Sequence, residues 1–200
     1  MVFVDFRQAY DLVPRQMLFK VLKRLGCGAV MLAALIAIYK VTNSIIGTAV
    51  FTTTVGVRQG SSTSCLLFIL YINDLIKLIK DNCHPDGFLS WLHLLVLMDD
   101  TVLLATTREN IINKITLLKQ YCDTYGMKIN AGKTRFFVIC GTVEDQRAIE
   151  VNGLVVEPCT KYTYLGSIFT ADGSVSSSVA AHVQSKMVHF NKFVSFLNKK

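Results

Sequence analysis

Prolines, paired cysteines and long apolar runs are all scarce in this sequence, and each scarcity excludes a class of protein. Only 3 of the 200 residues are proline and 52% are hydrophobic, so the composition is not that of a disordered chain. The longest apolar stretch, residues 29–39, is about half the length that a bilayer-spanning helix needs. No basic segment or cleavage site of a secretory signal is visible at the start. We therefore expect an intracellular protein, cytoplasmic or nuclear, that is neither secreted nor in a membrane.

Cysteine spacing and net charge indicate the redox compartment and the kind of binding partner. Six cysteines occur without a C-x-x-C pair, which favours free thiols in a reducing compartment over a zinc site or a disulfide framework. The net charge is +7, and the second hundred residues carry most of it, with 12 basic against 7 acidic residues. A basic excess favours a polyanion such as nucleic acid, but an ordinary basic globular protein explains this charge equally well.

The length and the pattern of apolar residues predict an α+β chain of one domain, or of one domain with the start of another. β-branched and aromatic residues predict strands at 2–4, 45–50, 52–57, 92–98, 101–105, 135–140, 149–156 and 162–169, with a tight turn at Asn152-Gly153 inside the stretch 149–156. Helices are expected from Pro14 to about residue 25, over 29–40, over 66–80, after a capping box at Thr106, and from about residue 174. The helix over 29–40 is apolar nearly all round, which predicts that it is buried.

Two adjacent aspartates, Asp99 and Asp100, separate two of the apolar runs and are the most informative feature of the sequence. The flanking runs suit a hairpin with the carboxylates at its tip, although a solvated turn is the ordinary explanation for such a pair. A third aspartate, Asp5, ends the strand expected at 2–4. If the strands are neighbours, three carboxylates meet at one edge of the sheet. Such a cluster needs divalent cations to offset its repulsion.

Five segments of the sequence, taken together and in this order, resemble the motifs of one enzyme family. The segments are Asp5-Phe6-Arg7-Gln8-Ala9-Tyr10-Asp11, Arg58-Gln59-Gly60, Leu97-Met98-Asp99-Asp100, the stretch from Asn130 to Thr134, and Tyr164-Leu165-Gly166. They resemble the palm of a reverse transcriptase, most closely that of the non-LTR (LINE-type) retrotransposons.

The resemblance implies a right-hand polymerase palm over residues 1–170, with an antiparallel sheet backed by helices. Motif A is then at 5–11, motif B at 56–71, the x-D-D hairpin at 92–106 and a primer-grip-like segment at 162–169. Residues 171–200 would begin a helical thumb, and the fingers are largely missing.

The resemblance also implies the catalytic residues. Asp5 and Asp99 are the implied ligands of two Mg²⁺ ions, with Mn²⁺ as a second candidate, and Asp100 is the implied support of the same metal site. Lys133 is implied to protonate the departing pyrophosphate, although a solvated lysine explains it nearly as well.

The remaining implied roles concern the nucleotide and the primer. Tyr10 is the implied steric gate against ribonucleotides, or alternatively a core aromatic. Gln59 and Gly60 are implied to pack against the incoming nucleotide and the template base, or alternatively belong to an ordinary helix-entry loop. Met98 is implied to lie under the primer terminus. The implied primer grip is formed by Tyr164, Leu165 and Gly166.

Three functions remain open from the sequence. The first is a retrotransposon reverse transcriptase domain, part of a larger polyprotein, that adds dNTPs to a DNA primer on an RNA template. The second is a truncated, inactive relic of such an enzyme. The third is a non-catalytic RNA- or DNA-binding fragment, which the basic second half favours.

Overall fold

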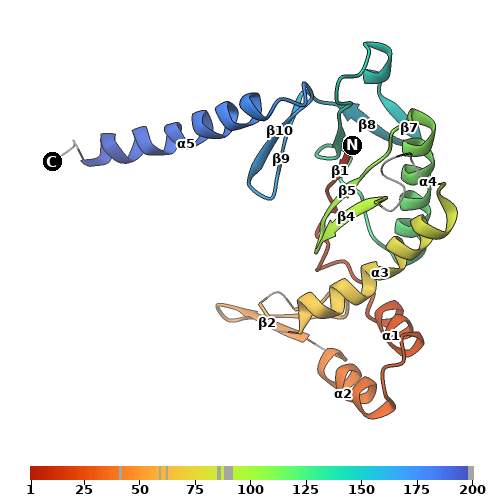
Figure 1. The fold of residues 1–200 in the computed structure, drawn as a ribbon. Helices are drawn as coiled ribbons and strands as arrows, with labels where there is room; N and C mark the ends of the chain where they lie inside the picture. Colours follow the sequence, from red (N-terminus) through yellow and green to blue (C-terminus); the bar gives the residue numbers. More distant parts are fainter. Residues whose placement is uncertain (41, 59, 62, 85–86, 88–91, 198–200) are drawn as a thin grey trace.

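The computed structural model describes residues 1–200 apart from 41, 59, 62, 85–86, 88–91 and 198–200. The described elements confirm the α+β fold class (Figure 1). In chain order they are β1 (Val2–Val4), α1 (Arg15–Arg24), α2 (Ala29–Tyr39), β2 (Thr42–Ile46), β3 (Ala49–Thr53), α3 (Ser64–Asn82), β4 (Leu94–Leu97), β5 (Asp100–Leu103), α4 (Arg108–Tyr125), β6 (Arg135–Phe136), the 3-10 turn η2 (Glu144–Gln146), β7 (Ile149–Val151), β8 (Leu154–Pro158), β9 (Lys161–Tyr164), β10 (Ser167–Thr170) and α5 (Val175–Leu197).

A six-stranded sheet in the order β4-β5-β1-β6-β8-β7 forms the centre of the molecule. β1 pairs antiparallel with β5 on one side and with β6 on the other. The expected antiparallel sheet is found except where β6 and β8 run parallel. β6 is also shorter than the strand expected at 135–140, because the chain turns away after Phe137 and Cys140 adopts a positive φ of 53°.

The two faces of the sheet are covered by different elements, because alternate residues of β1 point to opposite faces. Val2 and Val4 belong to the main core, which α1, α3 and α4 complete. Phe3 lies on the other face, where its ring stacks on Tyr162 of β9 with the centroids 4.2 Å apart. The hairpin β9–β10 is therefore attached to the sheet directly beside β1.

The segment 161–170 contains two strands, so the single strand expected at 162–169 is wrong. Leu165 and Gly166 both have positive φ, 49° and 78°, and reverse the chain between β9 and β10. Two consecutive positive φ angles suit the tight turn of a hairpin whose strands twist in the usual sense. By contrast, the turn expected at Asn152-Gly153 does separate β7 from β8.

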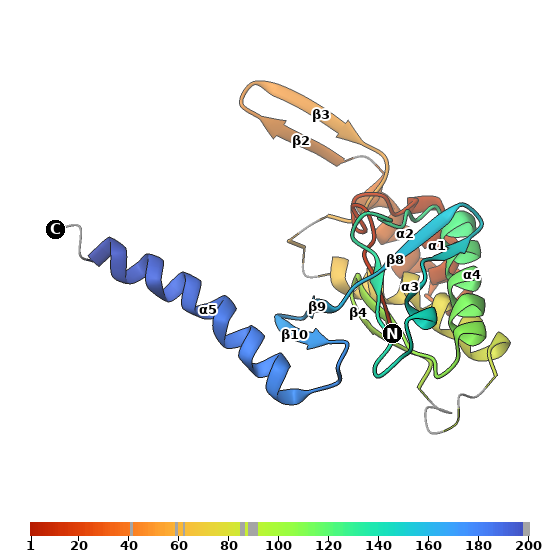
Figure 2. The same ribbon diagram turned by 90° about the horizontal axis from the view of Figure 1, so that it is seen from above.

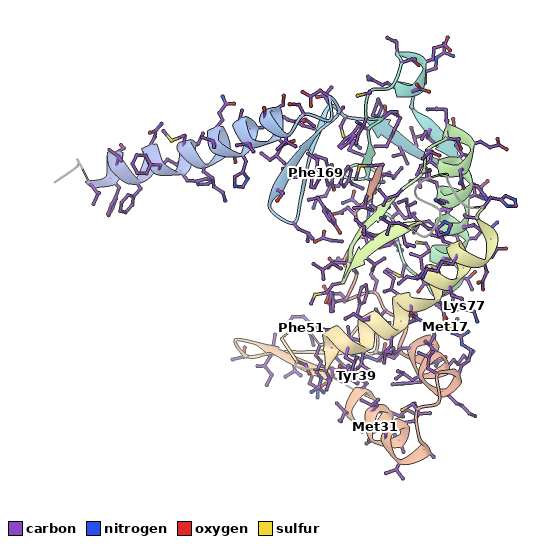
Figure 3. All side chains as sticks on the ribbon, in the orientation of Figure 1. Met17, Met31, Tyr39, Phe51, Lys77 and Phe169 are labelled. Carbon is purple, nitrogen blue, oxygen red and sulfur yellow. The ribbon has the colours of Figure 1, made fainter. Side chains whose placement is uncertain are left out.

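Helix α2 contradicts the prediction that the segment 29–40 is buried. Its only buried residue is Tyr39, whereas the Val30 and Met31 side chains are 87% and 61% exposed. Figure 3 shows Met31 at the outer edge of the molecule and Tyr39 at the junction with α3. Leu32 and Leu35 pack against the core, but no other described element covers the remaining sides of α2. An apolar sequence therefore reveals what a helix can bury, while the neighbouring elements decide what it does bury.

Helix α4 begins one residue later than its sequence suggests. The hydroxyl of Thr107 accepts the backbone N–H of Asn110 at 3.2 Å, so the capping box expected at Thr106 is wrong in register. Alongside it, α3 runs from Ser64 to Asn82, a little longer at each end than the predicted 66–80. The Tyr121 hydroxyl of α4 donates to the Tyr71 carbonyl of α3 at 2.8 Å and joins the two helices.

Two elements extend away from this body (Figures 1 and 2). One is the hairpin β2–β3, which pairs Thr42 with Thr53, so the strands expected at 45–50 and 52–57 form a few residues earlier. The other is α5, whose apolar stripe is exposed at Val183, Met187 and Phe190. None of the helices among the described residues has the length and apolar character that crossing a membrane requires. All six cysteines are free thiols, as predicted.

Candidate active site

The register between β1 and β5 brings two of the three aspartates together. Val4 pairs with Thr101, so the next pair in the same register is Asp5 with Asp100. Side chains directly opposite each other in antiparallel strands lie on the same face, here the face that β9–β10 covers. Asp99 precedes Asp100 in the turn between β4 and β5. β1 and β5 are thus neighbours, as the carboxylate cluster expected from the sequence requires.

The carboxylates influence one another electrostatically. The pKa of Asp100 is raised above its ordinary value, first by burial and then by the charges of Asp99 and Asp5. Asp5 and Asp99 line one open cavity of about 600 Å³ together with Asn130 and Lys133. Oxygen donors that repel one another suit a hard divalent cation. As they stand, however, no three His, Cys, Asp or Glu side chains in the described part of the chain are placed to hold a metal ion.

The backbone of Asp5 is fixed by the stretch from Asn130 to Thr134. The Asn130 N–H donates to the Asp5 carbonyl at 2.8 Å, and the Asp5 N–H donates to the buried Thr134 hydroxyl at 3.2 Å. These bonds hold Lys133 in the same cavity as the carboxylates. Thr134 was not among the expected site residues. Its position directly after Lys133 in the motif was the only feature of the sequence that indicated a place in the site.

Met98 occupies the tip of the β4–β5 hairpin. Its φ of 57° lies in the left-handed region, which residues other than glycine rarely adopt, and its side chain is 38% exposed. Such a conformation costs about 1–3 kcal/mol and persists only where the surroundings impose it. Met98 directly precedes Asp99 in this turn, and contact of its side chain with a primer terminus stays a prediction.

Tyr10 lies between the first motif and α3. Its ring stacks on Phe68 with the centroids 4.7 Å apart, and its carbonyl accepts the Val57 N–H at 2.8 Å. The pKa of Tyr10 is raised to about 12, first by burial, then by a hydrogen bond with Cys65, with a further contribution from the charge of Asp99. The ring therefore lies within electrostatic reach of the Asp99 carboxylate.

The loop before α3 is held against the same segment. The Gly56 N–H donates to the Val13 carbonyl at 2.8 Å, and a Cβ on Gly56 would lie 2.7 Å from the Asp11 carbonyl oxygen. With a φ of 82° as well, position 56 accepts only glycine without strain. Gly60 turns the loop with a φ of 80°, whereas Gln59 lies outside the described residues.

The expected primer-grip hairpin lies beside the aspartates. Burial, followed by the charge of Asp100, raises the pKa of Tyr164, and burial followed by Asp5 and Asp100 raises that of Tyr162. Leu165 forms the turn together with Gly166. Tyr162 was not expected in the site, although its alternation with Tyr164 was a signal for two rings on one face. The hairpin's position is thus established, and its grip on a primer stays a prediction.

A family model described as reverse transcriptase (RNA-dependent DNA polymerase) matches residues 1–169. The chain belongs to this family. The reverse transcriptase resemblance is therefore confirmed, and with it the relation to a nucleotidyltransferase.

Solved structures similar to this chain include two telomerases. The telomerase of Candida albicans, solved with a TWJ fragment of telomeric RNA, has a TM-score of 0.57 and 15% identity, over 86% of this chain and 29% of that one. A C-terminally truncated apo telomerase of Candida tropicalis has 17% identity over 85% of this chain and 33% of that one, with a TM-score of 0.43. At such identity the first likeness supports the palm-like fold alone. The chain spans about a third or less of either protein's length.

Replacing Tyr10 by alanine separates the two interpretations of this ring. If Tyr10 is a steric gate, Tyr10→Ala raises the use of ribonucleotides over deoxynucleotides in primer extension by about tenfold to a hundredfold, as one lost steric contact is worth about 1–3 kcal/mol. Tyr10→Phe keeps the ring and retains the wild-type ratio. An unchanged ratio together with a lower melting temperature would identify a core aromatic instead.

The raised pKa of Asp100 predicts a pH-dependent effect of its removal. A carboxyl whose pKa is higher in the folded state destabilises the fold above that pKa, and the cost disappears as the pH falls through it. We therefore expect Asp100→Asn to melt above the wild type near neutral pH and to converge with it in acid. Asp172 is the control, because hydrogen bonds, chiefly from Thr170, lower its pKa to about 2. Asp172→Asn should therefore lower the melting temperature near neutral pH, the opposite of the change expected for Asp100→Asn. A lower melting temperature for Asp100→Asn near neutral pH would contradict the mutual repulsion.

Proposed function

We propose that this chain is the palm of an RNA-directed DNA polymerase from a LINE-type retrotransposon. It would extend a DNA primer on an RNA template with dNTPs, inside the cell, as part of a larger polyprotein. The observation that carries the proposal is the β1–β5 register, which sets Asp5 opposite Asp100 and near Asp99 in a chain of the reverse transcriptase family. The resemblance of the five motifs, which is closest to the non-LTR elements, supports the LINE-type assignment.

The donor set supports a divalent cofactor. Asp5 and Asp99 would hold two Mg²⁺ or Mn²⁺ ions, and Asp100 would support them from the adjacent strand position. When bound, such ions stabilise the attacking and leaving oxygens of an in-line phosphoryl displacement.

The other residues would position the reactants around this centre. Tyr10 and the loop at Gly60 would border the nucleotide, and Met98 and the β9–β10 hairpin would hold the primer end. In the transfer, the primer 3′ oxygen would lose its proton to solvent water and bond to the α-phosphorus, while the bond from that phosphorus to the bridging oxygen would break. Pyrophosphate would leave with the electron pair, and Lys133, which lines the cavity of Asp5 and Asp99, would protonate it.

A non-catalytic nucleic-acid-binding fragment is the second candidate, and the composition of α5 favours it. This helix carries Lys186 and Lys192 but no acidic residue between Val175 and Leu197. A basic helix follows a phosphate backbone without reading sequence. Binding of this kind weakens with salt and does not need Asp99 or Asp100.

Primer extension by the 200-residue chain on an RNA template tests the proposal. We expect dNTP addition that stops when the metal is chelated and when the RNA template is omitted. RNA binding without extension, weakened by salt and unchanged in an Asp99→Ala, Asp100→Ala double variant, would contradict the proposal and support the binding fragment or the inactive relic.

A further inference from the structure

Two like charges lie opposite each other beside the cavity that Asp5 and Asp99 line. Phe6 and Ile129 form an antiparallel β-bridge, so the next pair is Arg7 with Lys128. The Arg7 N–H donates to the Lys128 carbonyl at 2.8 Å and fixes this pairing. Directly opposite side chains lie on the same face, and both line a cavity of about 340 Å³. Two positive charges in this arrangement repel each other and destabilise the pairing.

In the cavity that Arg7 and Lys128 share, the carboxylate lining does not balance the positive charge. Among the described residues, neither Arg7 nor Lys128 forms an ion pair. The acidic residue that lines the same cavity, Asp123, is already bound by Lys119 at 2.5 Å. The cavity therefore holds three cations against one carboxylate, and an anion is the partner that its lining lacks.

Arg7 connects this cavity to the carboxylate centre. It lines the cavity of Asp5, Asp99 and Lys133 as well as the one it shares with Lys128. Lys133 and Arg7 thus line the cavity of the aspartates, and Arg7 and Lys128 line the cavity next to it. An anion produced beside the aspartates, which repel it, meets these cations in turn.

We propose that Arg7 and Lys128 bind the pyrophosphate released by nucleotide addition and guide it away from the carboxylates. The inference rests on the proposed function for the source of the pyrophosphate. The guanidinium fork of Arg7 matches two phosphate oxygens at once, and Lys128 adds a point charge for the second phosphate group. The two linked phosphates thus supply the counter-charge that the opposed cations lack.

Calorimetric titration of the 200-residue chain with inorganic pyrophosphate, in magnesium-free buffer, tests this directly. We expect saturable binding that weakens by roughly tenfold or more in Arg7→Ala and in Lys128→Ala, since each removes a charge-assisted contact. Arg7→Lys recovers part of the loss. Arg147→Ala is the matched control, since it removes an exposed arginine outside both cavities and leaves the dissociation constant unchanged.

Thermal unfolding distinguishes anion binding from a purely structural role, because the two predict opposite changes in the melting temperature of Lys128→Ala. Without anion, Lys128→Ala should melt at or above the wild-type temperature, because the repulsion is gone. Added pyrophosphate should raise the melting temperature of the wild type but not that of an Arg7→Ala, Lys128→Ala double variant. A double variant that pyrophosphate stabilises as much as the wild type would place the anion elsewhere.

Several results would overturn the inference. These are no pyrophosphate binding by the wild type, unchanged binding in both alanine variants, or an equal loss in Arg147→Ala. A short RNA that binds through Arg7 and Lys128 when pyrophosphate does not would assign the pair to a nucleic-acid backbone. Asp99→Asn distinguishes the two proposals, because it should abolish extension while pyrophosphate binding persists or becomes stronger, as one repelling charge is gone. Primer extension by a chain that does not bind pyrophosphate would contradict this inference and leave the proposed function standing.

Discussion

Replacing Asp99 with asparagine is expected to lower the rate of primer extension by at least about a thousandfold and to leave the fold intact. Asparagine keeps the shape of the side chain but removes the charge that would hold a divalent ion. The loss of several kcal/mol of transition-state stabilisation accounts for a factor of this size. The same loss is expected for Asp5→Asn, because both carboxylates line the same cavity.

Steady-state extension and thermal unfolding should be measured on the same preparations. Asp81→Asn, at the exposed end of α3, is the matched control and should extend primers at the wild-type rate. The melting temperature of Asp99→Asn should equal or exceed that of the wild type, since a repulsive charge near Asp100 is removed. Retained extension in either active-site variant would contradict the assignment.

Replacing Arg15 with alanine is expected to destabilise the protein by about 3 kcal/mol or more, because each buried acceptor left without a partner costs about 1–3 kcal/mol. The buried Arg15 guanidinium donates to the carbonyls of Tyr39, Thr53 and Gly56 at 2.7–2.9 Å, and to the Thr42 hydroxyl at 3.0 Å. Burial lowers the pKa of Arg15.

These acceptors come from α2, from both strands of the β2–β3 hairpin and from the loop before α3. Arg15 therefore joins the hairpin to the loop that turns at Gly60, and its guanidinium carbon lies 5.5 Å from the centre of the Tyr39 ring. Denaturant unfolding followed by circular dichroism measures the loss. Lys20→Ala, exposed on the same helix, should change the stability by less than about 0.5 kcal/mol. A change of that small size in Arg15→Ala would show that the network contributes nothing.

The parts of the fold that follow from local pattern were predictable. The run Val2-Phe3-Val4 reads as a buried strand because all three residues are apolar and two are β-branched, and the aspartates mark where two such strands end. The motif order then indicated which strands are neighbours. Periodicity likewise placed α1, α3 and α4 to within a few residues.

The remaining features depend on contacts between distant segments, which local pattern does not contain. The exposure of α2 depends on which elements pack beside it, and the parallel pairing of β6 with β8 depends on how the chain crosses over. Likewise, nothing in the sequence around Arg7 signals that Lys128, more than a hundred residues later, lies opposite it. Arg15 resembles an ordinary helix-surface arginine until its acceptors are in place.

Manganese binding tests the central claim, that Asp5 and Asp99 form a divalent-cation site. The free Mn²⁺ signal in electron paramagnetic resonance can be followed as the 200-residue chain is added, without any need for primer, template or turnover. We predict that the wild type removes Mn²⁺ from solution, that Asp5→Asn and Asp99→Asn each lose most of this binding, and that Asp81→Asn keeps it. Equal Mn²⁺ binding by the wild type and both active-site variants would contradict the account.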